Sequence, residues 1–343
     1  MKPFLFVLFL SITSGLFAQR NEVISLVYHR FGDNRYPSTN ISLTTFEDHL
    51  KYLKSAGFKS VTFSEGLQII ASDAVKGKTV AITVDDGYQS FFEDGLPLLK
   101  KYGFTATLFV NTSTIGGNDY MSWDQIKKAQ SQGIEIGNHS DTHPYFLDVS
   151  ERTSASFFKQ EVETAQTQMT LELGKAPLVF AYPYGEVNEE MKPILKELGF
   201  IGAAAQNSGV IHSESDLFQC PRFPMSESFG TLTQFKEKVE MKGLEVLKAE
   251  VVSTGYNGSI DKPRINLEFK EEGLFIESMQ CFVQGSQCSK SVQIYKDGLV
   301  KMAIRPKTSL TSRRTLFTIT IPDNDGNWHW YSYLWVIPKT END

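Results

Sequence analysis

Two carboxylates stand side by side at the end of a strand-like segment, in TVAITVDDG (79–87). Residues 79–84 are almost all β-branched or small and apolar, which is typical of a strand buried on both faces. Asp85 and Asp86 end this run, and Gly87 allows the chain to turn. In α/β folds, ligands bind at the carboxyl ends of buried parallel strands, and this position favours a functional role over a merely solvated loop.

A pair of histidines follows a second strand-like segment, in IEIGNHSDTHP (134–144). His139 and His143 lie four residues apart, a spacing that would place both imidazoles on one face of a helical turn. Pro144 disfavours helical geometry at His143, so a tight loop is the alternative, and two surface histidines without a ligand are a third. Together with Asp86, the pair offers two neutral imidazoles and one carboxylate, a set that can hold a divalent metal and leave positions for water and substrate. A free carboxylate beside such a site could take a proton from water.

The segments around these motifs alternate between strand-like and helix-like patterns. Amphipathic segments separate strand-like runs at 23–29, 59–63, 79–84, 105–110, 134–138, 178–182 and 201–205. Two of the expected helices carry capping-box residues, Thr44 with Glu47 and Ser122 with Gln125. About seven or eight β/α units predict an α/β fold, either a parallel barrel or a doubly wound sheet, with its active face at the C-terminal ends of the strands.

The pattern changes beyond residue 245. Residues 249–340 alternate apolar and polar positions with short turns such as KDG and DNDG, which predicts a small C-terminal antiparallel β-sandwich. Residues 229–248 are expected to form a helical connector from the first domain at 20–228. In WHWYSYLWV (328–336) one face should lie in the sandwich core, and the other should pack between the domains or stack on sugar rings.

The two motifs, in this order and followed by YPYG, resemble those of the polysaccharide deacetylases of carbohydrate esterase family 4, over residues 20–225. The resemblance implies a distorted parallel (β/α) barrel of about seven to eight strands, of the NodB-homology type. It also implies that Asp85 is the catalytic base. The same resemblance assigns Asp86, His139 and His143 as ligands of zinc, with cobalt or nickel as alternatives.

The third motif of that family normally reads Arg-Pro-Pro-Tyr-Gly, and here it is FAYPYG (180–185). By resemblance, the backbone N–H of Tyr184 would point at the oxyanion and its ring would line the substrate groove. Ala181 stands where the arginine would be. We therefore expect Arg222, in CPRFP, to reach in from another segment and to orient Asp85.

The Leu-x-His motif that supplies the general acid in this family is absent downstream. His29 instead ends the first strand-like run, in LVYHRF, and secreted poly-N-acetylglucosamine deacetylases look similar, with Tyr-His at this position and the motif order rearranged. The first and last strands of a barrel are neighbours, so His29 is the expected acid. A histidine that only caps the strand end is the alternative.

Composition sets the remaining expectations. The chain of 343 residues has a net charge of −6 and no long run of Lys or Arg, which argues against nucleic acid as a partner. Residues 1–18 have the outline of a signal peptide, which predicts secretion or a periplasmic location, with an uncleaved anchor as the alternative. No later apolar segment approaches the length of a membrane span. Cys281 and Cys288 are spaced for a short disulfide loop, and Cys220 is expected to be a buried thiol.

These features predict a secreted, metal-dependent hydrolase that removes N-acetyl groups from an N-acetylglucosamine-containing polysaccharide and releases acetate. A deacylase or deformylase of a lipid-linked or small amino sugar is one alternative. A glycan-binding protein that has lost turnover is another, motivated by the absent arginine and the displaced histidine. The sequence leaves open the polymer, the native metal and the oligomeric state.

Overall fold

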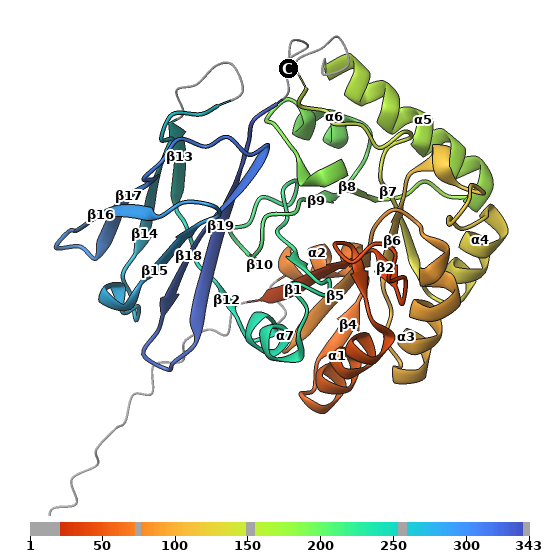
Figure 1. The fold of residues 1–343 in the computed structure, drawn as a ribbon, viewed down its shortest axis with the longest axis horizontal. Coiled ribbons are helices and arrows are strands. Elements are labelled where there is room, and N and C mark those ends of the chain that lie inside the picture. The colour runs from red at the N-terminus through yellow and green to blue at the C-terminus, as the bar shows by residue number, and fades with distance from the viewer. Residues whose placement is uncertain (1–20, 73–76, 149–154, 253–258, 339–343) are drawn as a thin grey trace, which may run out of the picture.

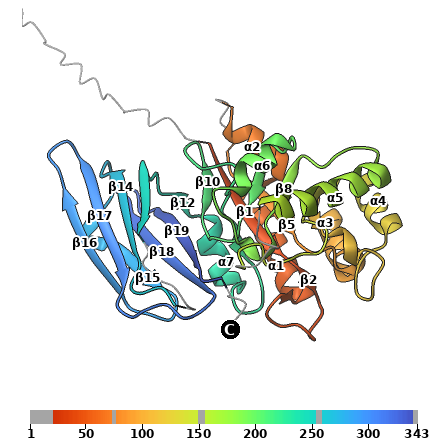
Figure 2. The same ribbon diagram turned by 90° about the horizontal axis from the view of Figure 1, so that it is seen from above.

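The computed structural model describes residues 21–72, 77–148, 155–252 and 259–338. The expected signal peptide at 1–18 lies outside these residues. Two domains lie side by side, an α/β domain drawn in red to green and a β-sandwich drawn in blue (Figures 1 and 2). In the described part of the chain, no helix combines the length and the apolar character needed to cross a membrane.

A curled, mainly parallel sheet forms the centre of the first domain, in the order β10-β1-β5-β6-β7-β8-β9. Its parallel strands are β1 (Glu22–Tyr28), β5 (Thr79–Val84), β6 (Thr107–Val110), β7 (Glu135–Asn138), β8 (Val179–Ala181) and β9 (Gly202–Ala204). One strand, β10 (Val210–His212), runs antiparallel to β1, and β4 (Lys59–Val61) adds to the edge of β5. A separate small pair joins β2 (Arg30–Phe31) and β3 (Asn40–Ile41). The predicted parallel (β/α) barrel type is confirmed.

The two ends of this sheet are joined by the segment 217–224. On one side the segment hydrogen-bonds to β9, where the Ala203 N–H donates to the Leu217 carbonyl over 2.8 Å. On the other side its last residues form β11 (Phe223–Pro224), which pairs with β1. The segment carries Arg222, so this residue enters the barrel between the first strand and the last one.

Helices cover the outside of the curled sheet (Figure 1). They are α1 (Leu43–Ser55), α2 (Phe63–Ile70), α3 (Leu96–Tyr102), α4 (Trp123–Ser131), α5 (Ala155–Leu173) and α6 (Met191–Glu197). The predicted capping box of α4 is confirmed, since Ser122 and Gln125 each cap the other's backbone N–H. The predicted box at Thr44 and Glu47 is wrong. Helix α1 begins earlier, with Ser42 as its N-cap, and the Glu47 carboxylate instead accepts hydrogen bonds from Lys101 and Tyr102.

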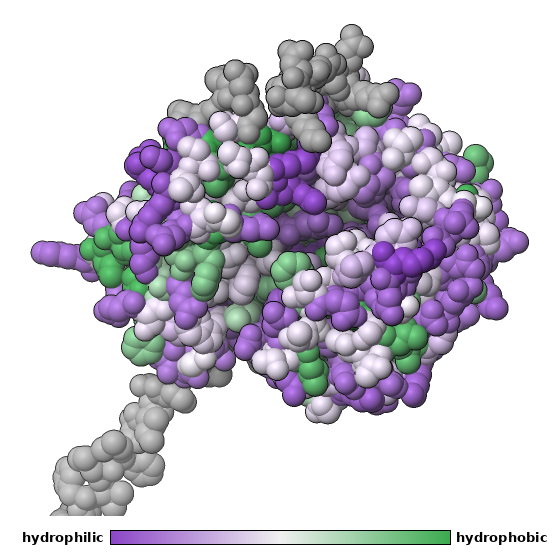
Figure 3. Space-filling model, viewed as in Figure 1, coloured by the Kyte–Doolittle hydropathy of each residue, from purple (hydrophilic) through white to green (hydrophobic). Residues whose placement is uncertain are grey.

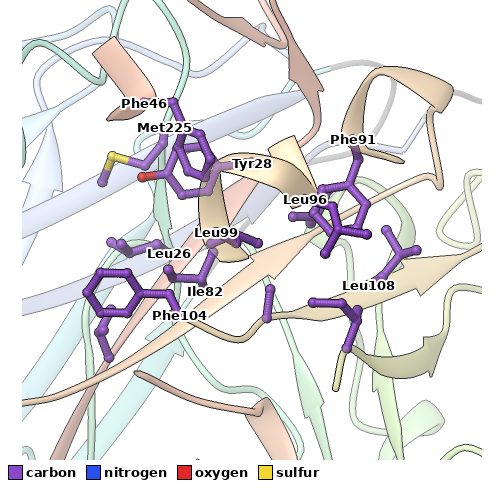
Figure 4. Packing of buried hydrophobic residues seen from close by; sticks show 14 of the residues in the cluster. Leu26, Tyr28, Phe46, Ile82, Phe91, Leu96, Leu99, Phe104, Leu108 and Met225 are labelled. Atoms are coloured by element: carbon purple, nitrogen blue, oxygen red, sulfur yellow. The ribbon is translucent and has the colours of Figure 1, made fainter. Parts of the chain in front are cut away.

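An apolar core holds the strand ends next to one another. Figure 4 shows side chains of β1, β5 and β6 packed against helices α1 and α3, among them Leu26, Tyr28, Ile82, Leu108, Phe46 and Leu99. All six are 0–1% exposed, and full burial of such a side chain contributes about 1.5–3 kcal/mol to stability. The register pairs Tyr28 with Val84, which brings the residues that follow both strands side by side.

The second domain is a sandwich of two four-stranded sheets. One sheet contains β12 (Lys242–Gly243), β19 (Trp328–Val336), β18 (Arg314–Pro322) and β15 (Gln280–Val283). The other contains β13 (Lys248–Val252), β14 (Arg264–Lys270), β17 (Leu299–Pro306) and β16 (Cys288–Ile294). All pairs are antiparallel except β12 with β19. The Cys281–Cys288 disulfide and the buried free Cys220 are as predicted.

The segment 229–248 links the two domains. It contains one helix, α7 (Leu232–Val239), and then the short strand β12, which already belongs to the sandwich. The aromatic strand β19 faces both ways: Trp335 is buried in the sandwich core, whereas the Trp330 ring packs edge-on against Phe223 of β11 at 5.3 Å. Core and interdomain packing is therefore confirmed for this strand. The surface is hollowed where the two domains meet, and hydrophilic residues border the hollow (Figure 3).

Candidate metal and catalytic site

Three potential metal ligands meet at the C-terminal ends of β5 and β7. The Asp86 Oδ1 atom lies 3.5 Å from His139 Nε2 and 3.4 Å from His143 Nε2. A tetrahedral ion with ligand bonds of about 2.1 Å holds its ligands about 3.4 Å apart, so this spacing fits such an ion. The structure thus brings together two imidazoles and a carboxylate from segments about fifty residues apart in the chain.

The fixed orientation of His139 is also suited to binding a metal ion. Its Nδ1–H donates to the Ala181 carbonyl over 2.7 Å, and the side chain is 1% exposed. Such a bond selects the tautomer whose Nε2 lone pair is available to a metal. Ala181 is the residue at the family's arginine position, so its backbone orients a metal ligand although its side chain offers no charge.

Four residues of the site adopt left-handed backbone conformations, which non-glycine residues rarely do. The φ angles are 75° at Asp86, 66° at Ser140, 55° at His143 and 59° at Tyr184. Conformations of this kind persist only where surrounding contacts hold them, and they cluster at functional sites. His143 therefore lies in a tight loop after β7 and not on a helical turn, the alternative that Pro144 indicated.

Side chains outside the motifs hold this loop. Asn138 at the end of β7 accepts a hydrogen bond from the Ser140 N–H and donates to the Val162 carbonyl of α5. From α5, the Glu161 carboxylate accepts hydrogen bonds from both the N–H and the hydroxyl of Thr142, over 2.8 and 3.0 Å. Glu161 is only 7% exposed. Sequence analysis missed it, because a glutamate in a polar helix carries no local signal of burial.

Asp85 is bound by Arg222 in a bidentate ion pair. The Arg222 Nη1 and Nη2 atoms lie 2.7 and 2.8 Å from the two carboxylate oxygens, and both side chains are 0% exposed. Arg222 also donates to the Thr83 hydroxyl and to the Ala205 carbonyl. Burial opposes ionisation of Asp85, but the charge of Arg222 outweighs it and lowers the pKa of the Asp85 carboxyl. The expected approach of Arg222 from another segment is what the structure shows.

His29 lies beside the two aspartates. It directly follows β1, and the Asp85 N–H donates to the Tyr28 carbonyl over 2.9 Å, which extends the β1–β5 ladder to this point. The His29 charge contributes to lowering the pKa of both Asp85 and Asp86. The side chain is half-buried, so it can reach a ligand at the mouth of the barrel.

Tyr184 forms another side of the site. It lies in a short turn, Pro183–Gly185, directly after β8, and its ring packs edge-on against His143 at 4.5 Å. Tyr145 stacks on Tyr184, with the ring centroids 3.7 Å apart and the planes 10° apart. Gly185 is required in this turn, because its φ is +71° and an added Cβ would lie 2.4 Å from Gln206.

A second aromatic cluster contains Tyr88, which lies two residues after Asp86 in the chain. Arg30 lies between two rings, with its Cζ atom 3.5 Å from the centroid of Tyr88 and 4.0 Å from that of Tyr36. Tyr120 packs against Tyr88 at 5.0 Å. The Asp86 carboxylate raises the pKa of the Tyr88 phenol further, after burial as the larger cause. Two groups of tyrosines therefore lie near Asp86, His139 and His143, called the metal triad below, and the sequence motifs indicated only Tyr184 among them.

Burial and charge shift the pKa values of the two histidines in opposite directions. Burial lowers the pKa of His139, but the facing carboxylates of Asp86 and Asp85 outweigh it and raise the value above the usual 6.5. Burial, together with the charge on His139, lowers the pKa of His143 to about 4. Without a metal, His139 therefore keeps its second ring proton to a higher pH than His143 does.

This proton predicts how metal affinity depends on pH. A metal ligand must be a neutral imidazole, so the proton on His139 competes with the ion, whereas His143 is already neutral above its pKa. As pH falls through the raised pKa of His139, beginning above pH 6.5, affinity for Zn²⁺ or Co²⁺ should weaken about tenfold per pH unit. Titration calorimetry in two buffers of different ionisation enthalpy should show about one proton released per ion below that pKa. Release of two protons, or of none, would contradict the prediction.

Comparisons with known proteins agree with this geometry. Residues 72–203 match the polysaccharide deacetylase family. This chain carries a polysaccharide deacetylase domain. YxkH of Bacillus subtilis (strain 168), classed among the polysaccharide deacetylases, is 27% identical over 204 residues, or 59% of this chain and 70% of its own. A poly-β-1,6-N-acetyl-D-glucosamine N-deacetylase of Staphylococcus aureus is 25% identical over 218 residues, or 60% of this chain and 75% of its own.

Solved structures show the same fold for the deacetylase domain. IcaB from Ammonifex degensii superposes with a TM-score of 0.55 at 25% identity, covering 64% of this chain and 97% of its own. The Streptococcus pyogenes deacetylase PplD superposes with a TM-score of 0.59 at 20% identity, covering 64% of this chain and 99% of its own. The deacetylase domain is thus a hydrolase of amide (N-acetyl) bonds, and its reaction is N-deacetylation of a polysaccharide.

Proposed function

We propose that this protein is an exported, metal-dependent hydrolase that removes N-acetyl groups from a polymer of N-acetylglucosamine, with a β-1,6-linked chain as the favoured substrate. The observation that carries the proposal is the metal triad of Asp86, His139 and His143 beside the buried Asp85–Arg222 pair. The named substrate of the Staphylococcus aureus relative supports the choice of polymer.

Asp86, His139 and His143 would hold the metal. A divalent ion in this position lowers the pKa of water and polarises a carbonyl oxygen. Asp85 lies beside the triad and stays ionised, because Arg222 lowers the pKa of its carboxyl. It would accept the proton of the attacking water, while the bidentate bond with Arg222 fixes the direction of its carboxylate.

Tyr184 and His29 would complete the reaction. The backbone N–H of Tyr184 would donate to the oxyanion, and one such preorganised donor contributes about 2.7–4 kcal/mol to transition-state stabilisation. The protonated form of His29 would donate to the departing amine, so that acetate and a free glucosamine leave. The half-buried position of His29 next to Asp85 supports this assignment.

The tyrosines near the triad support a sugar polymer as the substrate. Tyr36 and Tyr145 are 42% and 38% exposed, so part of each ring is accessible to a ligand. Exposed aromatic rings offer apolar surface together with a polar tip, which suits the faces of sugar rings. We propose that sugar units on either side of the reacting one contact these rings.

Export is part of the proposal. The apolar run at 4–10 after Lys2 supports a signal peptide, and the Cys281–Cys288 disulfide supports an oxidising compartment.

Acetate release from a panel of substrates tests the proposal. The panel contains poly-β-1,6-N-acetylglucosamine, chitin oligomers, peptidoglycan, and N-acetyl and N-formyl forms of a lipid-linked amino sugar, each with added zinc, cobalt or nickel. We expect acetate from the β-1,6-linked polymer at least about tenfold faster than from the others, because the pocket contacts differ between linkages. His29→Ala should lower the rate by about 10²- to 10⁴-fold, whereas His329→Ala, in the sandwich, should leave it unchanged.

Each alternative function predicts a different result in this substrate panel. Formate release, or turnover of the lipid-linked sugar alone, would favour the deacylase or deformylase. Binding of a polymer without acetate release under any metal would favour a glycan-binding protein. An unchanged rate in His29→Ala would remove His29 as the acid.

A further inference from the structure

The turn that carries Tyr184 needs support from outside the barrel. The φ angle of Tyr184 is 59°, a conformation that costs energy for a residue with a Cβ. Glu186, directly after the turn, is 1% exposed, so its carboxylate is removed from water. A strained tyrosine and a buried carboxylate two residues later both require partners that hold them in place.

Arg314 of the sandwich supplies one partner. It begins β18, and its Nη1 donates to the backbone carbonyl of Tyr184 over 3.0 Å. Its guanidinium also lies 5.6 Å from the centre of the Tyr184 ring. The peptide plane that follows Tyr184 is therefore held directly by the second domain.

Arg313 supplies the other partner. Its Nε and Nη2 atoms lie 2.8 and 2.7 Å from the two carboxylate oxygens of Glu186, and its Nη1 donates to Asp148 in the loop beyond His143. Its Cζ atom lies 4.0 Å from the centre of the Tyr145 ring, the ring that stacks on Tyr184. Arg313 thus binds both loops that flank the metal triad, one through Glu186 and the other through Asp148.

The backbone of the two arginines is itself well fixed. Arg314 pairs with Val336 in the β18–β19 ladder, and the Arg313 carbonyl accepts a hydrogen bond from the Ile337 N–H over 2.7 Å. A rigid sheet can position a site more accurately than a loop.

We propose that the C-terminal sandwich contributes to the deacetylase site by fixing the position of Tyr184. Arg313 and Arg314 are the positioning residues, and they hold the strained Tyr184 turn and the Tyr145 ring that stacks on it. This inference rests on the proposed role of Tyr184 as the oxyanion donor. Its physical basis is that a displacement of about 1 Å in a catalytic group can cost about 10² in rate. The arginines touch neither the metal triad nor the Asp85–Arg222 pair in the described contacts, so they should act on the chemical step and not on metal binding.

Substitutions in the full chain test the inference. Arg314→Gln should lower kcat about 10- to 100-fold while KM changes less than about threefold, and Arg314→Lys, which keeps one donor, should recover part of the loss. Arg313→Gln with Glu186→Gln removes both charges of this ion pair together, so that no buried carboxylate is left unpaired; this double variant should fold and should show a similar loss of kcat. Zinc affinity should stay within about twofold of the wild type in both. The matched control is Arg305→Gln, at an exposed arginine on β17 of the same domain.

A second measurement does not depend on activity. Hydrogen exchange read by mass spectrometry should show faster exchange of the amides at 182–187 in Arg314→Gln and in the double variant, with unchanged exchange in β1 and β5. Wild-type kcat in both variants, or unchanged exchange at 182–187, would overturn the inference. A general rise in exchange throughout the barrel, with kcat falling only as the folded fraction falls, would also overturn it. If the wild type releases acetate from no substrate, the proposed function fails, and the exchange result still decides whether the arginines hold this turn.

Discussion

Asp85→Asn is expected to lower kcat for acetate release by about 10²- to 10⁴-fold, the range found when a general base is removed. Asparagine has nearly the same shape, so KM should change little. The substitution also leaves Arg222 buried without a charged partner. Breaking a buried ion pair from one side typically costs about 3–5 kcal/mol, so the free energy of unfolding should fall as well. Initial rates with the preferred polymer and urea unfolding curves measure the two effects.

The control for Asp85→Asn is Asp48→Asn. Asp48 lies on α1, with its side chain 40% exposed and paired only with the surface residue Lys51 in the described contacts. This variant should keep both the wild-type rate and the wild-type stability, since exposed ion pairs contribute little. If Asp85→Asn released acetate at the wild-type rate, Asp85 would not be the base.

His143→Ala is expected to weaken binding of Zn²⁺ or Co²⁺ by more than about 100-fold. Loss of a residue that merely supports a ligand already costs about 10- to 100-fold in affinity, and His143 is one of only three protein ligands in the candidate site. Wild-type protein inactivated with a chelator should regain activity when the ion is returned, whereas His143→Ala should not. Titration calorimetry of the metal-free proteins measures the affinity.

His212→Ala is the control for metal binding. His212 pairs with Glu22 at the N-terminal end of β1, the opposite end from the candidate site. Its replacement should leave the affinity and the stoichiometry of the ion unchanged. Equal metal affinity in His143→Ala and in wild type would exclude the proposed triad.

Local patterns in the sequence predicted those features that depend on neighbouring residues. The alternation of strand-like and helix-like segments predicted the parallel sheet, because side-chain periodicity reflects which face of an element is buried. Asp85 and Asp86 follow a buried strand, so the sequence predicted that they lie at the mouth of the barrel, where the C-terminal ends of the parallel strands are found. Pro144 favoured the loop at His143 through its steric effect on the preceding residue.

Local patterns failed where two plausible partners competed. Thr44 and Glu47 have the spacing of a capping box, yet Ser42 caps α1. The Glu47 carboxylate accepts hydrogen bonds from Lys101 and Tyr102 of α3 instead. Intrinsic capping preferences are worth about 1 kcal/mol, and a tertiary contact of similar size is enough to override them.

The sequence by itself was enough to predict the metal triad, the position of the aspartate pair, the disulfide and the order of the two domains. Each of these features depends on a short motif or on the periodicity of apolar residues. The absent family arginine pointed to Arg222 as the partner of Asp85, but only the tertiary structure decided that Arg313 binds Glu186, a pair separated by 127 residues. The same holds for Glu161 and Tyr145, which reach the site from α5 and from the loop after His143. The reason is physical: the residues next to an arginine in the sequence do not show which distant carboxylate it will bind. That partner is selected only when the whole chain folds.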